Sequence, residues 1–226
     1  MVKHAVFCAA GDVAAIARTA GETIAQVPED RGRYADADLA PVLQALLRLR
    51  ALAEGAALAV LMEADERGVV ASSTSAGLAQ WVRTLADEMD VPITGSESSR
   101  WAHLARECRR PDSGVLRDAC TSGRVPVTIG SVLGKELRGM RSQVEADTWD
   151  ACADALTGFA YGGASGSEIH RAVDVVLTQY GNGRWIETRT KAAHQRRGFT
   201  AFVPEGHDTW TARITVDADA LAQIQR

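Results

Sequence analysis

Apolar residues recur at intervals of three and four along most of the first 197 positions, the spacing that places side chains on one face of an α-helix. The clearest run begins at Asp36, where leucine and valine at positions 39, 42, 43, 46, 47 and 52 share one face. Pro41 suits the first turn of this helix and Gly68 its end, while Gly55 is a residue at which it could bend. We therefore predict a long helix over about 36–68 that forms the spine of a helical bundle.

Six further helices are expected before residue 181, because residues typical of helix ends separate the apolar runs. Thr94 and Glu97 have the spacing of a capping box, as do Ser165 and Glu168, and Gly123 is suited to closing a short helix. The expected helices cover about 72–90, 94–110, 113–123, 127–140, 149–159 and 168–180. A short basic helix is expected to follow over about 183–198.

The pattern changes after Gly198, where two runs rich in β-branched and aromatic residues flank the turn-forming residues EGHD at 205–208. This arrangement predicts a β-hairpin, and the acidic residues that follow it favour the start of a final helix. The expected fold is mainly α, a multi-helix bundle with a small C-terminal β-hairpin. Residues 1–197 would form the helical bundle domain, and residues 198–226 would pack on the same domain.

The composition supports a helical protein that folds without a cofactor. Of the 226 residues 46% are hydrophobic and only 5% aromatic, a mixture that favours closely packed helices. The four cysteines are widely spaced and form no metal or redox motif, so they are expected to be reduced thiols in the core. Asp12 and Glu22 interrupt the N-terminal apolar run too early for a membrane span or a signal peptide, which indicates a cytoplasmic protein.

Charge is unevenly distributed although its sum is only -4. Residues 98–141 hold nine basic and four acidic side chains, and a second basic stretch follows within 181–226. Such clusters are typical of phosphate binding, so we expect a DNA-binding surface. Its candidate residues are Arg100, Arg106, Arg109, Arg110, Arg184, Arg189, Lys191, Arg196 and Arg197. The alternative is that these side chains form solvated helix faces and pair with the acidic stretches.

No pattern predicts a catalytic or metal site. The glycine-rich run at 161–168 lacks the preceding strand and the lysine of a phosphate-binding loop. His170 and Asp174 lie one helical turn apart but have no third metal ligand nearby, and the spacing of His103 and Cys108 turns them to different faces of a helix. We therefore expect no catalytic residue, no metal and no cofactor in this chain.

Three stretches carry a resemblance to a known family: ALAEGAALAVLMEADERG with STSAGLAQWVR, then SRWAHLARECRRPDSGVLRDACTSGRVPVTIGSVLGKEL, and KAAHQRRGFTAFVPEGHDTWTARITVDADAL. Together they resemble the actinobacterial domain-of-unknown-function family 222, the 13E12-repeat proteins. That family typically lies N-terminal to an HNH endonuclease module. The resemblance covers about residues 39–226 and rests on the hydrophobic pattern with a few anchor residues.

The resemblance implies a helical accessory region of an HNH-type endonuclease system, which contacts DNA backbone or positions a nuclease module. The metal-binding His-Asn-His module of that family has no counterpart in residues 1–226, so no nuclease activity is expected of this chain alone. The partners implied are double-stranded DNA and a nuclease domain. The alternative is a protein-interaction or oligomerisation module that uses the leucine-rich helix for self-association and binds no nucleic acid.

Overall fold

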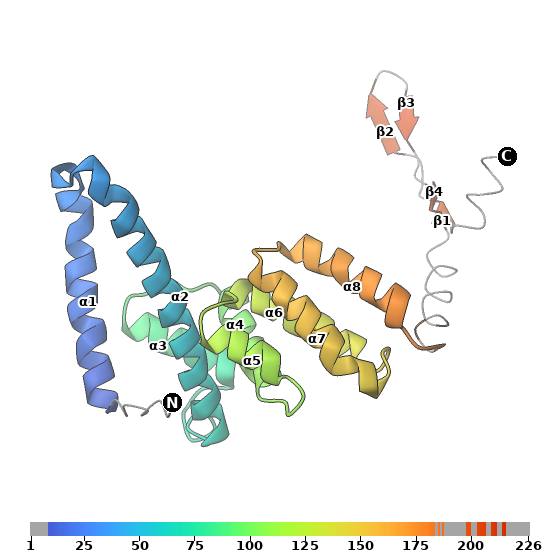
Figure 1. Cartoon of the computed structure of the whole chain (residues 1–226), viewed down its shortest axis with the longest axis horizontal. Helices are drawn as coiled ribbons and strands as arrows, with labels where there is room; N and C mark the ends of the chain where they lie inside the picture. The colour runs from blue at the N-terminus through green and yellow to red at the C-terminus, as the bar shows by residue number, and fades with distance from the viewer. Residues whose placement is uncertain are drawn as a thin grey trace. The chain divides into compact units, whose positions relative to one another are not determined.

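The computed structural model describes residues 9–183, 185 and 187, together with short strands between residues 198 and 215. Within these residues the chain is mainly helical (Figure 1). The helices are α1 (Ala10–Asp30), the 3-10 turn η1 (Arg31–Arg33), α2 (Asp36–Glu66), α3 (Leu78–Glu88), α4 (Gly95–Cys108), α5 (Gly114–Thr121), α6 (Val127–Met140), α7 (Ala146–Tyr161) and α8 (Gly166–Tyr180). The predicted mainly α fold and its helical bundle are therefore confirmed.

The strands form two antiparallel pairs. Their bounds are β1 (Gly198–Phe199), β2 (Val203–Gly206), β3 (Thr209–Thr211) and β4 (Ile214–Thr215). Strand β1 pairs with β4, and β2 pairs with β3. The turn of the predicted hairpin, at residues 207–208, lies outside the described residues, as do the C-terminal helix and most of the basic helix expected at 183–198. The hairpin therefore stays a prediction.

The chain divides into two compact units, Met1–Arg50 and Ala51–Arg226, with the boundary inside α2. In the smaller unit, α1 buries none of its residues, and the large side chains of α2 up to Arg50 are exposed or only half-buried. The sequence analysis expected the domain boundary at residue 197, and that expectation stays a prediction. In the larger unit α6 packs against α4, α5, α7 and α8.

The core of the larger unit is built from the inward faces that the sequence pattern predicts. Leu58, Leu104, Leu133 and Ile169 are fully buried, on α2, α4, α6 and α8 respectively. Two of the predicted helix starts have the expected caps: the Thr94 hydroxyl accepts from the Glu97 amide, and Ser165 forms the complete capping box with Glu168. These caps satisfy backbone amides that have no partner within the helix.

Close backbone approaches at two glycines fix how α2 meets α5 in the larger unit. A Cβ atom at Gly55 would collide with the carbonyl oxygen of Thr121, and one at Gly123 would collide with the carbonyl oxygen of Ala51. Gly123 also has a φ of +72°, which disfavours any side chain. Gly55 is thus the point at which α2 lies against the end of α5, and α2 continues through this glycine without a break. None of the helices among the described residues is long and apolar enough to cross a membrane.

Candidate functional site

Four of the nine predicted DNA-binding residues can be placed. Arg100 and Arg106 lie on α4, and Arg109 and Arg110 follow its last turn. The other five lie outside the described residues, where no side chain is placed: Arg184, Arg189, Lys191, Arg196 and Arg197. The prediction that the two basic stretches share one surface is therefore untested.

Arg109 and Arg110 are already engaged in ion pairs. Arg109 binds the carboxylate of Asp65 on α2. The Nε atom of Arg110 lies 3.7 Å from a carboxylate oxygen of Glu107 and 3.7 Å from one of Asp112. Pairing with an acidic side chain, the alternative considered above, therefore describes these two arginines better than an open phosphate contact does.

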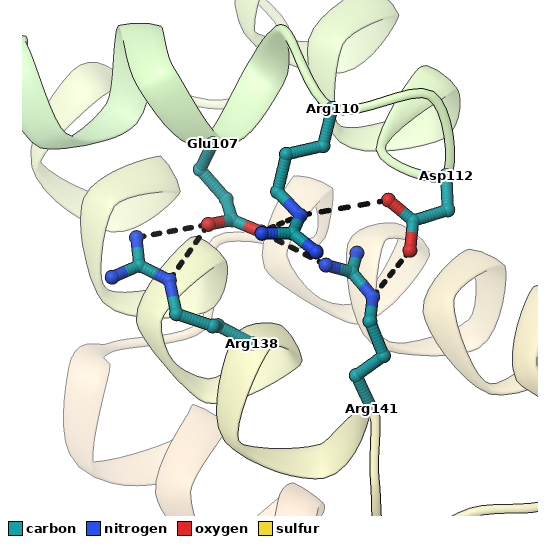
Figure 2. A network of polar contacts seen from close by, with 5 residues as sticks. All are labelled: Glu107, Arg110, Asp112, Arg138 and Arg141. Atoms are coloured by element: carbon teal, nitrogen blue, oxygen red, sulfur yellow. Dashed lines mark hydrogen bonds and ion pairs between the residues drawn. The ribbon is translucent and has the colours of Figure 1, made fainter.

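Glu107 is the centre of this charge network (Figure 2). Its side chain is only 2% exposed, and its Oε2 atom accepts a hydrogen bond of 2.9 Å from the Nε of Arg138 on α6. Arg141, which follows α6, lies 3.7 Å from the Oε1 atom of Glu107 and also pairs with Asp112. A buried carboxylate is tolerated only when opposite charges and hydrogen bonds compensate for lost hydration. The network therefore joins the end of α4 to α6.

A different face of α4 is basic and open to solvent. Its five exposed residues follow one another at spacings of three, one, three and three, so they share one side of the helix. They are Ser96, Ser99, Arg100, His103 and Arg106, which we call the α4 basic face. It carries three side chains that are or can become cationic, two hydroxyl groups and no carboxylate. No ion pair to Arg100 or Arg106 is found among the described residues.

One hollow of about 320 Å³ borders this face on the α3 side. Arg83 of α3 and Arg106 of α4 both line it, together with Ser98 and Ser99. The amino end of α3, which begins after Gly77, also lines the hollow and has no side-chain cap. Uncapped amides at a helix start favour anions, because their partial positive charge adds to that of the two guanidinium groups.

A second hollow, of about 280 Å³, borders the face on the side of α6 and α8. Arg100 and His103 of α4 line it together with Lys135 of α6 and His170 of α8. The Nδ1 atom of His170 lies 3.2 Å from the Oε1 atom of Glu136, so this histidine already has an acidic neighbour. Ser99 of the α4 basic face lines both hollows.

The residues that line the two hollows include several basic groups and no aspartate or glutamate. Positive charge without a lining carboxylate attracts anions rather than metal ions. Within the described part of the chain, no group of three or more His, Cys, Asp or Glu side chains is placed to hold a metal ion. The chemistry that this arrangement offers is therefore the binding of phosphate or a similar anion.

Nucleophilic chemistry finds no support near α4. Cys108 is fully buried, whereas His103 is exposed, as their spacing predicts for different helix faces. A hydrogen bond with Cys120 and burial together raise the pKa of the Cys108 thiol far above its usual range. A thiol that does not ionise is a poor nucleophile.

Sequence reasoning missed four residues of these hollows as binding candidates. Arg83 on α3 lies outside the basic stretches, and Lys135 on α6, although it belongs to the basic stretch 98–141, was not singled out from its neighbours. His103 and His170 were considered only as a nucleophile partner and a metal ligand. Arg83, Lys135 and His170 lie beside α4 only because of how α3, α6 and α8 pack in the larger unit, and sequence spacing does not reveal that packing.

Comparison with protein-family models, with curated proteins and with solved structures finds no match to this chain. The resemblance to the 13E12-repeat proteins therefore stays a prediction that rests on the three sequence stretches alone. The properties of the site have to be argued from its own residues.

Proposed function

We propose that the α4 basic face binds the phosphate backbone of double-stranded DNA. The observation that carries this proposal is the row of Arg100, His103 and Arg106 on one exposed face, bordered by two hollows that no carboxylate lines. Arg83 and Lys135 extend the positive charge to both sides of the row. Groups that contact phosphates in this way hold DNA without reading its sequence.

The setting that we propose for this binding is a helical accessory region of an HNH-type endonuclease system, in the cytoplasm. The resemblance described above supports it, since the second of its three stretches, which begins at Ser99, contains most of α4. In this role the chain would hold DNA backbone or position a nuclease module, and it would carry no catalytic residue. Phosphate contacts suit such a role because they orient a duplex irrespective of its bases.

The strength of binding should depend steeply on salt. Each neutralised phosphate releases condensed counterion, so about four contacts, from Arg83, Arg100, Arg106 and Lys135, predict a slope near -3.6 for the logarithm of affinity against that of salt. We expect the double variant Arg100→Gln with Arg106→Gln to weaken binding and to reduce this slope by about 1.8. Fluorescence anisotropy of a labelled duplex at several salt concentrations measures both quantities.

A matched control removes two charges elsewhere. Arg67 and Arg171 are exposed arginines of the larger unit, and neither lines one of the two hollows beside α4. The double variant Arg67→Gln with Arg171→Gln changes net charge equally and should leave the slope unchanged. If both double variants weaken binding to the same extent, general charge explains the affinity and the α4 basic face is not the site. The absence of any binding at low salt would reject the proposal.

A second candidate function, an interaction or oligomerisation module, is favoured by one specific observation. The leucine-rich face of α2 that the sequence predicts is exposed at Leu39, Leu43 and Leu47. Apolar surface of this kind marks a site of protein association more often than a solvated face. These residues lie on the smaller unit and do not contribute to the α4 basic face.

A further inference from the structure

The smaller unit exposes an unusual amount of large apolar surface. Seven of its large aliphatic side chains are between 37% and 65% exposed. They are Val13, Ile16 and Ile24 on α1 and Leu39, Leu43, Leu47 and Leu49 on α2. Since neither α1 nor the part of α2 up to Arg50 buries a residue, this unit lacks the packed face on which helices in proteins depend for most of their stability.

The exposed surface has both a ridge and a groove. Leu39, Leu43 and Leu47 are spaced four apart, so they form one continuous ridge along α2. A mainly apolar hollow of about 550 Å³ is lined by Ile16, Ile24 and Leu49 with the small side chains between them. Both features belong to Met1–Arg50.

Charged residues end the leucine ridge symmetrically. Asp36 precedes Leu39 by three positions, and Arg50 follows Leu47 by three positions. From Asp36 to Arg50, the successive residues of the ridge are therefore 3, 4, 4 and 3 positions apart, so the spacing is the same in both directions from Leu43. At about 100° per residue, these five residues fall within one arc of roughly 80°. Opposite charges thus lie at opposite ends of one apolar ridge, and both ends are exposed.

We propose that the α2 ridge binds the same ridge of a second copy of this chain, with the two helices antiparallel and a two-fold axis at Leu43. This arrangement places Leu43 against its own copy and Leu39 against Leu47 of the other chain. It also brings Asp36 of each chain next to Arg50 of the other. Arg50 has contacts within its own chain as well, so this pair adds to an interface that the leucines dominate.

A second copy fits this surface better than an unrelated protein does. A two-fold interface uses the same patch on both molecules, so the patch must be complementary to itself when reversed. The spacing and the charges of the ridge meet that condition. Two helical hairpins that associate in this way supply the helices of a four-helix bundle.

The proposal does not rest on DNA binding, because it uses residues of the smaller unit only. Its first test is sedimentation equilibrium of the full chain over a range of concentrations. The chain should reach the mass of a dimer, and Leu43→Glu should make it a monomer, because two carboxylates would meet at the axis. Val60→Glu is the control: Val60 is 66% exposed on the same helix but outside the ridge, and this variant should still dimerise.

A charge exchange tests the antiparallel arrangement itself. Asp36→Arg and Arg50→Asp should each weaken the dimer by about tenfold or more, since each places like charges opposite one another. The double variant restores opposite charges across the axis and should regain most of the affinity. Residues 36 and 50 are about 21 Å apart along one helix, too far for the exchange to act within a single chain.

Cross-linking provides a geometric test that does not depend on affinity. In a chain with Cys8 changed to Ser, Leu43→Cys should form a disulfide-linked dimer, because residue 43 faces its own copy. Val175→Cys, at a 58% exposed position on α8, should not. A chain that stays monomeric at about 100 µM, a dimer that survives Leu43→Glu, or a charge exchange without rescue would each overturn the proposal.

Discussion

Glu107 illustrates how a single residue can connect several helices of the larger unit. Its carboxylate is almost completely buried, and the guanidinium groups of Arg110, Arg138 and Arg141 surround it. Arg141 in turn lies with its guanidinium carbon 4.9 Å from the centre of the Trp149 ring on α7. Since the carboxylate is the centre of the cluster, its removal leaves several positive charges close together in a partly buried site.

We expect Glu107→Gln to destabilise the protein by roughly 1–3 kcal/mol, because the buried parts of its arginine partners lose their compensating charge while the exposed parts stay hydrated. The free energy of unfolding, measured by urea titration with circular dichroism, gives this quantity. Glu63→Gln is a suitable control, since Glu63 pairs with Arg67 in a solvent-exposed i, i+4 contact. That change should cost less than about 1 kcal/mol. Equal losses of unfolding free energy for the two variants would show that the buried cluster stabilises the protein no more than an exposed ion pair does.

The roles of individual arginines could be predicted only in part. The density of arginines in residues 98–141 indicated a basic stretch, and two of its residues, Arg100 and Arg106, lie exposed on α4. It could not distinguish Arg106, which has no ion pair among the described residues, from Arg109, which pairs with Asp65, a residue 44 positions earlier in the chain. Which arginine is paired depends on how the helices pack, and a local pattern carries no information about that.

At the scale of helices, the sequence predicted α2 to α8 well but did not predict α1. Periodic apolar residues and end signals such as Thr94 and Ser165 marked the others. Helix α1 has mostly alanine and threonine between a few larger apolar side chains, and Gly11 and Gly21 weaken its pattern further. Val13, Ile16, Ile24 and Val27 nevertheless recur at helical spacings, so a pattern was present, but the N-terminal apolar run was tested only as a membrane span or a signal peptide.

Packing between helices α2 and α5 yields a prediction at this scale. Gly55→Ala should destabilise the larger unit by about 2 kcal/mol or more, because the new methyl group collides with backbone atoms of Thr121 that cannot move aside easily. Gly139→Ala is the opposite case: a Cβ atom at residue 139, on α6, meets nothing within 4 Å. That variant should be stabilised by up to about 1 kcal/mol through helix propensity.

Thermal unfolding followed by circular dichroism compares the two glycine variants directly. A wild-type melting temperature for Gly55→Ala would mean that α2 and α5 do not approach one another as closely as the structure has them. Gly139→Ala checks the general effect of alanine in a helix of this protein.

At the scale of the whole molecule, the two units differ in how much they bury. The larger unit contains a continuous core, whereas α1 in the smaller unit has no buried residue. Local opening costs little free energy where few apolar contacts are lost. The two units should therefore differ in the protection of their backbone amides.

Hydrogen exchange read by mass spectrometry measures that difference. At a concentration low enough to keep the chain monomeric, peptides from α1 should exchange orders of magnitude faster than peptides from α4 and α6. Raising the concentration should slow exchange in α2 near Leu43 if a second copy binds there. Equal protection of α1 and α6 in the monomer would contradict the burial described here.

The sequence predicted the class of the fold more completely than it predicted the site. Helical periodicity is local and can be recognised in one chain, but the hollows beside α4 depend on Arg83, Lys135 and His170, which come from three other helices. The exposure of the leucine ridge was not predictable either, because an apolar helical face looks the same whether its partner belongs to the same chain or to another.

The close approach of α2 to α5 also constrains how this protein can evolve. Gly55 and Gly123 each lie against the backbone of the opposite segment, so a mutation at either position forces the two segments apart. A lineage that loses Gly123 therefore has to accept a shifted α5, and the shift removes the reason to keep Gly55. Positions 55 and 123 are 68 residues apart in the chain. We expect them to change together among descendants of a common ancestor, and the pair should identify distant relatives whose surface residues have diverged.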